Sequence, residues 1–295
     1  MSLDQLINLL LVVTLTEMML ATGLGVRVMD AIGVARDGRL LLGAGLANYV
    51  AVPFAAVILL LLANADPMAA AGILILAVCS GAPYGPPLTA LAGGKTAISV
   101  GLTIILAGSS VLMAPLLLFL LLPLTSRGMD LHVDAPGMLR AILAIQLFPL
   151  CAGLAVNHWR PNLAARLLPP AVAVGKVLNA ATLAVILVTH FPQLLDIRPG
   201  SILAMVTLLV VSLGVGWGAG GRRSGDRKAV ALTTSIRNVG LGLVIAAGSF
   251  AGPSAVTAVL AYGLVQLLGS LLLALWWRRG PSLAAVRADD QARVQ

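Results

Sequence analysis

Long apolar runs follow one another along almost the whole chain, and short polar or proline-containing segments separate them. A membrane-spanning helix needs about 20 mostly apolar residues. The pattern predicts nine such helices, at residues 3–22, 39–62, 68–92, 95–122, 137–157, 171–191, 200–219, 227–250 and 254–278. Breaks such as Leu168-Pro169-Pro170 are expected to end helices, because proline lacks the backbone donor that a continuing helix requires. The chain carries an acid, Asp4, at the start of the first run, where a cleaved signal peptide carries basic residues, so we expect this run to remain as a span.

The composition agrees with a membrane protein. Of the 295 residues, 59% are hydrophobic and 10% are charged, whereas a soluble domain has about 25% charged residues. This balance excludes a secreted disulfide scaffold, a nucleic-acid-binding domain and a disordered chain. Cys79 and Cys151 lie in apolar runs, so both are expected to be reduced. We predict an all-α polytopic membrane protein that contacts lipid and binds no nucleic acid.

The distribution of positive charge predicts the orientation, since cytoplasmic loops of membrane proteins carry an excess of Lys and Arg. With the N-terminus outside, the outer loops hold two basic residues, Arg127 and Arg198. The cytoplasmic ends then hold 14: Arg27, Arg36, Arg39, Lys95, Arg160, Arg166, Arg222, Arg223, Arg227, Lys228, Arg278, Arg279, Arg287 and Arg293. We therefore expect a multi-pass protein of the inner (cytoplasmic) membrane with a cytoplasmic C-terminus.

The two halves of the chain repeat the same arrangement. Corresponding spans begin 159 to 161 residues apart, as 39–62 and 200–219 do. The pattern divides the single transmembrane domain into a first repeat at 3–122, a connector helix at 137–157, a second repeat at 171–278 and a cytoplasmic tail at 279–295. One helix between two four-helix repeats inverts the second repeat, and inverted repeats are characteristic of secondary transporters.

One span in each half contains residues that interrupt a helix. The span 68–92 contains three prolines and two glycines between Ser80 and Pro87, and the span 227–250 has a polar centre between Thr233 and Gly240. Irregular backbone at membrane depth survives only where protein or water covers it. Matching interruptions in two repeats indicate a substrate site where the two broken helices cross.

Both interruptions resemble the broken helices of the bile acid:sodium symporter family. The resemblance rests on three stretches: Cys79-Ser80-Gly81 followed by residues 88–100, Arg237-Asn238-Val239-Gly240-Leu241 ending at Phe250, and Gly269-Ser270-Leu271-Leu272 with Trp276. It implies the family's ten-helix plan without its first helix. Spans 39–62, 68–92, 95–122, 200–219, 227–250 and 254–278 would form a core that moves against a panel of the remaining three.

The resemblance also implies positions for sodium ligands. Ser99 and Thr103 match ligand positions, and Asn48 stands where the family has Gln. At four other positions the residue type is different: Gly85 and Pro86 replace Ser and Asn, Thr233 replaces Glu, and Arg237 replaces Gln. Loss of the carboxylate and gain of a guanidinium disfavour a bound cation, because Arg donates hydrogen bonds and accepts none. We therefore expect weak or no sodium coupling and no other cofactor, with Arg237 acting as a built-in cation in place of an ion.

Arg237 is the most informative residue, since a charge at mid-membrane costs about 2.5–3.5 kcal/mol on insertion scales and faces a cavity or a partner. We expect it to bind an anionic group of the substrate; a salt bridge that locks the crossing is the alternative. The expected substrate residues are Arg237, Asn238, Thr233, Thr234, Ser235, Tyr84, Gly85 and Asn48, with Gln146 and Gln266 of lower weight.

Glu17 is the one carboxylate well inside a predicted span. It is interpreted as a proton-coupling site, as a partner for Arg237, or as a group near the cytoplasmic end that faces water or pairs with a loop Arg. It therefore joins Ser99, Thr103 and Asn48 as an ion-coupling residue.

The predicted function is alternating-access transport of small or amphipathic organic anions across the cytoplasmic membrane. An arsenite (metalloid) or auxin-type efflux carrier, and a membrane scaffold or receptor, are the alternatives. No metal-ligand cluster or catalytic constellation occurs in the sequence, so we expect neither an enzyme nor a metal site. The substrate and the oligomeric state stay open.

Overall fold

The computed structural model describes residues 3–26, 28–126, 135–195, 197–250 and 253–279, and every regular element among them is a helix. The all-α prediction is thus confirmed. In chain order the elements are α1 (Leu3–Gly25), α2 (Val28–Arg36), α3 (Gly38–Leu46), η1 (Ala47–Ala51), α4 (Val52–Leu62), α5 (Pro67–Val78), α6 (Gly85–Leu91), α7 (Thr96–Thr125), α8 (Ala135–Ala141), η2 (Ile142–Leu147), α9 (Phe148–Trp159), α10 (Pro161–Leu195), α11 (Pro199–Ala219), α12 (Ser224–Ser235), α13 (Val239–Ser249) and α14 (Ser254–Arg279). Of the predicted tail 279–295, only Arg279 belongs to the described residues.

Within the described residues, eight helical stretches are long and apolar enough to cross a membrane. They match eight of the nine predicted spans. The predicted span 68–92 is not one long helix: it consists of α5, a shorter apolar helix, and α6, with residues 79–84 between them. The prolines explain the division, because Pro86 and Pro87 stand in the first turn of α6, where a missing N–H leaves no bond unmade.

Two local expectations are wrong. The helix α10 runs through Pro169 and Pro170, where the sequence predicted a loop. Prolines inside a membrane helix remove hydrogen bonds without ending it where a neighbouring helix supports the segment, and α10 packs along α1. The helix α2 was not predicted at all; it is nine residues long and packs against α7.

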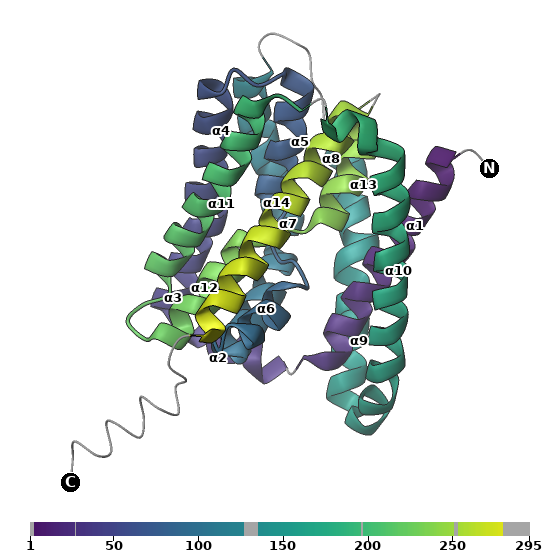
Figure 1. The fold of residues 1–295 in the computed structure, drawn as a ribbon. Helices are drawn as coiled ribbons and strands as arrows, with labels where there is room; N and C mark the ends of the chain where they lie inside the picture. The colour runs from purple at the N-terminus through teal and green to yellow at the C-terminus, as the bar shows by residue number, and fades with distance from the viewer. Residues whose placement is uncertain (1–2, 27, 127–134, 196, 251–252, 280–295) are drawn as a thin grey trace.

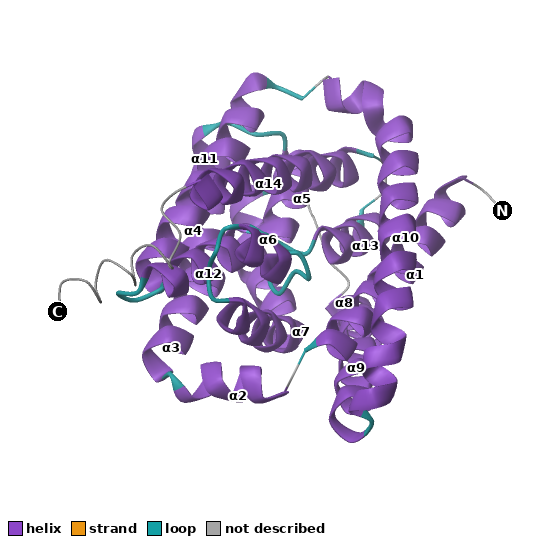
Figure 2. Cartoon of the chain, turned by 60° about the horizontal axis from the view of Figure 1, so that its bottom comes forward, coloured by secondary structure: helices purple, strands orange, loops and turns teal. Residues whose placement is uncertain are grey.

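The helices form two groups (Figures 1 and 2). The panel group consists of α1, α10 and the continuous span α8–η2–α9; within it, α1, α9 and α10 pack closely on one another at the right of both views. The other helices form the core group, in which α5 packs against α14 and α11 against α12. This grouping agrees with the core and panel that the family resemblance implies. The division into inverted repeats at 3–122 and 171–278 remains a prediction.

The two broken helices meet in the core group. We call residues 79–84 and 236–238, the irregular segments of the two helices, the crossing. The backbone N–H of Asn238 donates to the carbonyl of Cys79 at 2.8 Å, which joins the segments directly. The side chain of Asn238 accepts from the N–H of Leu241 at 3.1 Å and so caps α13. Both breaks therefore lie within the stretches that the sequence predicted.

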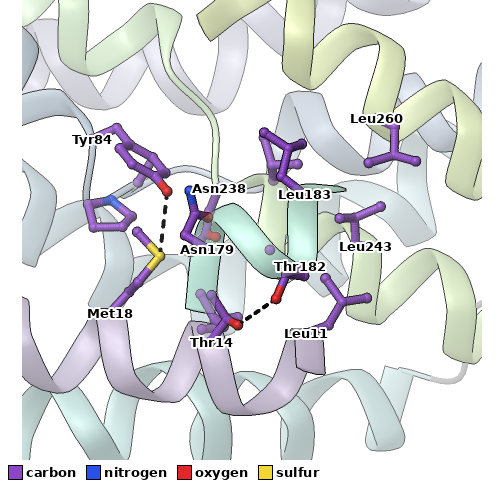
Figure 3. Close-up of a pocket in the computed structure, with 15 residues that line it drawn as sticks. Leu11, Thr14, Met18, Tyr84, Asn179, Thr182, Leu183, Asn238, Leu243 and Leu260 are labelled. Atoms are coloured by element: carbon purple, nitrogen blue, oxygen red, sulfur yellow. Dashed lines mark hydrogen bonds between the residues drawn. The ribbon is translucent and has the colours of Figure 1, made fainter. Parts of the chain in front are cut away.

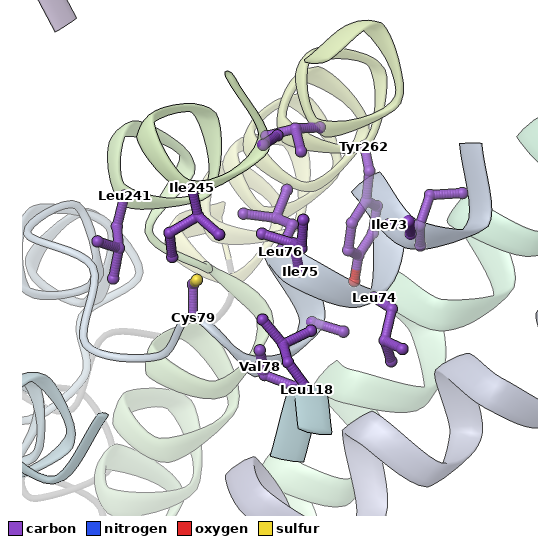
Figure 4. Close-up of a cluster of buried hydrophobic side chains, with 14 of the residues drawn as sticks. Ile73, Leu74, Ile75, Leu76, Val78, Cys79, Leu118, Leu241, Ile245 and Tyr262 are labelled. Carbon is purple, nitrogen blue, oxygen red and sulfur yellow. The ribbon is translucent and has the colours of Figure 1, made fainter. Parts of the chain in front are cut away.

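Burial identifies the crossing as the centre of the molecule. In the most apolar part of the stretch that contains α12 and α13, 83% of the residues are buried. In that of the α10 stretch Pro161–Val185, 11% of the residues are buried, so this helix faces the surroundings. Every residue from Ala70 to Val78 on α5 is buried. Figure 4 shows the end of α5, with Cys79 pointing toward Leu241 and Ile245 of α13. Most of the irregular backbone is thus covered by protein, which is one of the two settings in which such backbone is tolerated at membrane depth.

The C-terminal ends of α2, α9 and α14 all lie toward the lower end of the molecule in Figure 1. All three are predicted to be cytoplasmic from the charge distribution. At this end Lys95, at the start of α7, forms a 2.7 Å salt bridge with Asp226 on α12. The fold is thus compatible with a single cytoplasmic face.

Cysteine labelling tests the orientation. Ser224, the first residue of α12, and Ser254, the first residue of α14, are both exposed. In a Cys151→Ser background, Ser254→Cys is expected to react with a membrane-impermeant maleimide on intact cells, and Ser224→Cys only after permeabilisation. Cys79 is fully buried and adds no background. Labelling of both positions from one side would contradict the topology.

Candidate functional site

Arg237 lies in the crossing and is 1% exposed. Its backbone is held by Gln266 of α14, which accepts from the Arg237 N–H at 3.0 Å and donates to the Arg237 carbonyl at 3.1 Å. The guanidinium Nη1 donates to Oδ1 of Asn48 at 3.0 Å. Its Nε and Nη2 are buried without any hydrogen-bond partner. The side chain is therefore fixed at one edge, while two donors remain free to bind an acceptor.

Asn48 owes its position to a π-helical turn, η1. Such turns inside α-helices occur frequently at functional sites, because the extra residue re-aims side chains. The Asn48 amide nitrogen donates to the carbonyl of Ala44 at 2.8 Å and to Thr234 Oγ1 at 3.1 Å. With its oxygen occupied by Arg237, the amide is fully used. The structure thus brings Asn48, Thr234 and Arg237 together, while their role in substrate binding remains a prediction.

A second π-helical turn, η2, carries Gln146 to the other side of the crossing. Asn238 Nδ2 donates to Gln146 Oε1 at 2.8 Å. The Gln146 amide nitrogen donates to the carbonyl of Ala107 and to Ser110 Oγ, each at 2.9 Å. Gln146 and Gln266, both given low weight from the sequence, are therefore two of the side chains that hold the crossing. Each is a single amide in an apolar helix, and nothing in the neighbouring sequence indicates that it binds the crossing.

A cluster of hydroxyl groups lies beside the crossing. Ser99 Oγ and Thr233 Oγ1 form a 2.7 Å hydrogen bond between α7 and α12. Gly85 starts α6 next to this pair, and a Cβ there would lie 3.4 Å from both oxygens. Thr103 follows Ser99 by one turn of α7, and its hydroxyl is buried without a partner. We call Ser99, Thr103 and Thr233 the hydroxyl cluster.

Ser235 forms its side-chain hydrogen bonds with residues outside the predicted substrate set. Its hydroxyl pairs with Ser270 Oγ of α14 at 3.0 Å and donates to the carbonyl of Leu232 at 3.2 Å. Both Ser235 and Ser270 are fully buried. In this conformation Ser235 thus joins two helices, α12 and α14.

A cavity of about 80 Å³ lies between the panel group and the crossing. Its wall includes Tyr84 and Asn238 from the crossing, and it is mostly apolar. Thr14 of α1 and Thr182 of α10 form a 2.8 Å hydrogen bond at its edge, and the Tyr84 hydroxyl donates to the sulfur of Met18 at 3.6 Å (Figure 3). The cavity is lined by Leu11, Thr14, Leu15, Met18, Ala82, Pro83, Tyr84, Asn179, Thr182, Leu183, Asn238, Val239, Gly240, Leu243 and Leu260. Arg237, directly before Asn238, is not part of the wall in this conformation.

Comparison of the sequence with models of known protein families identifies the family. The Sodium Bile acid symporter family matches residues 12–214, more than two thirds of the chain. The chain belongs to the sodium bile acid symporter family. It is therefore a member of a transporter family and not an enzyme.

Individual members of the sodium bile acid symporter family cover most of the chain. The probable sodium/metabolite cotransporter BASS1 of Arabidopsis thaliana chloroplasts is 28% identical over 276 residues, which are 92% of this chain and 67% of that protein. The uncharacterized sodium-dependent transporter YocS of Bacillus subtilis is 27% identical over 241 residues, 79% of this chain and 72% of that one. The names of both relatives include sodium, against the expectation of weak or no sodium coupling drawn from Thr233 and Arg237.

Several polar residues that lie at the site of this sodium bile acid symporter family member were not singled out from the sequence. Tyr49 accepts from Ser80 Oγ at 2.9 Å and donates to the carbonyl of Leu106 at 2.9 Å. Tyr262 of α14 is fully buried and carries a hydroxyl group into the same apolar interior as Arg237. Asn179 and Thr182 line the cavity from α10. These residues are single polar groups in apolar helices, so only the rotation of each helix reveals that they face the site.

Glu17 lies away from Arg237, on the panel side. Both carboxylate oxygens are buried, and neither has a hydrogen-bond partner. No described basic side chain forms a salt bridge with it. Pairing with Arg237 or with a described loop Arg is therefore not observed.

Proposed function

We propose that the protein is a secondary transporter that carries small or amphipathic organic anions across the cell membrane by alternating access, together with sodium. One observation carries the anion assignment: the buried guanidinium of Arg237 has two unpartnered donors and no acidic partner among the described residues. The membership in a family of transporters carries the transport assignment.

A carboxylate is the ligand that fits Arg237 best. Its two oxygens match the planar fork of a guanidinium and form two parallel charge-assisted hydrogen bonds. The free donors Nε and Nη2 form one edge of that fork. The N-terminus of α13, which begins two residues later, adds the positive end of a helix dipole. Substrate binding would then neutralise a charge that is otherwise unfavourable at this depth.

The cavity gives this anion a route to Arg237. It lies between the panel group and the crossing, and Asn238 belongs to both the cavity wall and the polar network around Gln146. A volume of about 80 Å³ holds only a small group. A relative movement of the panel group and the core group would widen this space and bring Arg237 to its surface. The apolar wall suits an aliphatic or amphipathic acid.

Sodium would bind at the hydroxyl cluster. The hydroxyl oxygens of Ser99 and Thr233 are 2.7 Å apart, and the unpartnered hydroxyl of Thr103 lies one turn of α7 beyond Ser99. Oxygen atoms are the ligands that hard cations prefer. The cluster contains no carboxylate, so we expect low sodium affinity. Arg237, held by Asn48 at 3.0 Å, supplies a second fixed positive charge in place of another ion.

A thermal-shift screen of organic acids tests the proposed function. Each acid is compared with its uncharged amide, in sodium and in potassium buffer. Acids are expected to raise the melting temperature and amides are not, and sodium is expected to enlarge the shift. The best acid is then tested for uptake into proteoliposomes under an inward sodium gradient. Equal shifts for acid and amide, or no uptake of any stabilising acid, would overturn the proposal.

Restoring a carboxylate at position 233 tests the sodium site. Thr233→Glu is expected to lower the sodium concentration for half-maximal stabilisation at least about tenfold, equivalent to 1.4 kcal/mol, since a charged oxygen ligand joins the cluster. Ser99→Ala is expected to abolish the sodium-specific shift. Ser270→Ala serves as the control. It removes a buried hydroxyl of α14 that pairs with Ser235 of α12, outside the hydroxyl cluster. A sodium response that is unchanged in both Thr233→Glu and Ser99→Ala would exclude this site.

A further inference from the structure

Glu17 occupies an unusual place in the seam between α1 and α10. Its carboxylate fills the space that a Cβ on Gly175 would need, so it packs against bare backbone of α10. One turn away, Thr14 and Thr182 close the same seam with a 2.8 Å hydrogen bond. Glycine at position 175 is thus what makes room for the acid.

The carboxyl group of Glu17 has neither a donor nor a counter-ion. Both oxygens are buried and unpartnered. The titratable or charged side chains on the described elements that pack against α1 are Cys151 and His158 on α9 and Arg166, Lys176 and His190 on α10, with Tyr84 across the cavity; α13 and η2 carry none. None of these forms a salt bridge with Glu17 among the described residues. Lys176, the neighbour of Gly175 in the chain, is exposed.

An isolated carboxylate charge is strongly unfavourable in an apolar interior, whereas the neutral acid is tolerated. Ionisable groups inside membrane helices mark ion pathways and proton relays. The absence of a donor or counter-ion for either carboxylate oxygen therefore favours the neutral form of the acid. Water reaches it only when the seam or the adjoining cavity opens, and Met18, the next residue along α1, already lines that cavity.

We propose that Glu17 is a proton-binding site, loaded in the conformation described here and opened to water when the panel group moves against the crossing. On loading, a carboxylate oxygen of Glu17 takes a proton from a hydronium ion in the opened cavity: one O–H bond of hydronium breaks, an O–H bond to Glu17 forms, and a water molecule is left. On release the Glu17 O–H bond breaks and the proton passes to a water molecule, which becomes hydronium. No electron is transferred. The inference depends on the proposed movement of the panel group, and not on Arg237 or on the identity of the substrate.

The sequence offers a direct measurement, because Glu17 is the only glutamate of the chain. Full-length protein made by cell-free synthesis with glutamate labelled at the carboxyl carbon with ¹³C gives one side-chain resonance. At pH 7 this resonance is expected at the position of a neutral acid, where a solvent-exposed glutamate is ionised. A resonance of an ionised carboxylate at pH 7 would overturn the proposal, whatever the protein transports.

A second measurement tests exchange with water. Proteoliposomes on a solid-supported membrane are stepped from neutral to alkaline pH without substrate, and the charge displaced by proton release is recorded. Glu17→Gln is expected to reduce this charge to the level of empty liposomes, and Glu17→Asp to retain it. Asp37→Asn, which removes an exposed acid but keeps a side chain that caps α3, is the matched control. An undiminished charge in Glu17→Gln would overturn the proposal.

Failure of this inference is distinguishable from failure of the proposed function. The acid screen reports on Arg237 and on transport, whereas the ¹³C resonance reports on Glu17 alone. Acid-dependent stabilisation with an ionised Glu17 would leave the transporter intact and remove the proton site. Protein that binds no acid but shows a neutral Glu17 would do the reverse.

Discussion

Arg237→Gln is expected to weaken binding of the best carboxylate by about thirtyfold, or about 2 kcal/mol, the usual scale for a buried charge-assisted hydrogen bond. Glutamine keeps a polar side chain in the crossing and restores the residue type that the family resemblance implies at this position. It removes the cation and the two unpartnered donors Nε and Nη2. Isothermal titration calorimetry on purified protein, with the acid selected by the thermal-shift screen, measures the change.

Two further variants separate a substrate role of Arg237 from a structural one. Arg237→Lys is expected to recover part of the affinity, because an ammonium keeps the charge but cannot make the two-pronged contact. Arg198→Gln removes the same charge from an exposed position and is expected to leave binding unchanged. If Arg237→Gln keeps full affinity in a folded protein, Arg237 only locks the crossing to Asn48 and the substrate need not be an anion.

Gly81→Ala is expected to destabilise the fold by about 3 kcal/mol or more. Gly81 has φ +83°, in the left-handed region, where an L-residue pays about 1–2 kcal/mol. A Cβ there would also collide with the backbone N and Cα of Ala107 on α7. Backbone atoms cannot rotate away as a side chain can, so overpacking adds about 1–3 kcal/mol. Thermal unfolding in detergent, followed by circular dichroism, measures the loss.

Gly108, one residue beyond that contact on α7, provides the control. A Cβ on Gly108 would meet no atom within 4 Å. Gly108→Ala is therefore expected to be neutral or to stabilise α7 by up to about 1 kcal/mol, the difference in helix propensity. Equal melting temperatures for Gly81→Ala and Gly108→Ala would show that the close approach at the crossing is relaxed in solution.

The features that the sequence predicted are local ones. Apolar runs of about 20 residues identify membrane spans because each span must satisfy its own backbone hydrogen bonds. Prolines and glycines between Ser80 and Pro87, and polar residues between Thr233 and Gly240, located both breaks for the same reason. Where a local rule conflicted with packing it failed: Pro169 and Pro170 lie inside α10, which α1 supports along its length.

The partners at the site depended on the tertiary structure. Arg237 and Asn48 are 189 residues apart in the chain, and Asn238 and Gln146 are 92 apart. The two π-helical turns that aim Asn48 and Gln146 at the crossing have no signature in an apolar sequence. The packing of α1 against α10 likewise decided that Glu17 faces Gly175 rather than a cation. The sequence by itself thus determined the class of protein, most of its spans and the positions of the two breaks, because these follow from the backbone's need for hydrogen bonds in lipid. Only the tertiary structure decided which polar groups meet, because that depends on the rotation and packing of helices distant in the chain.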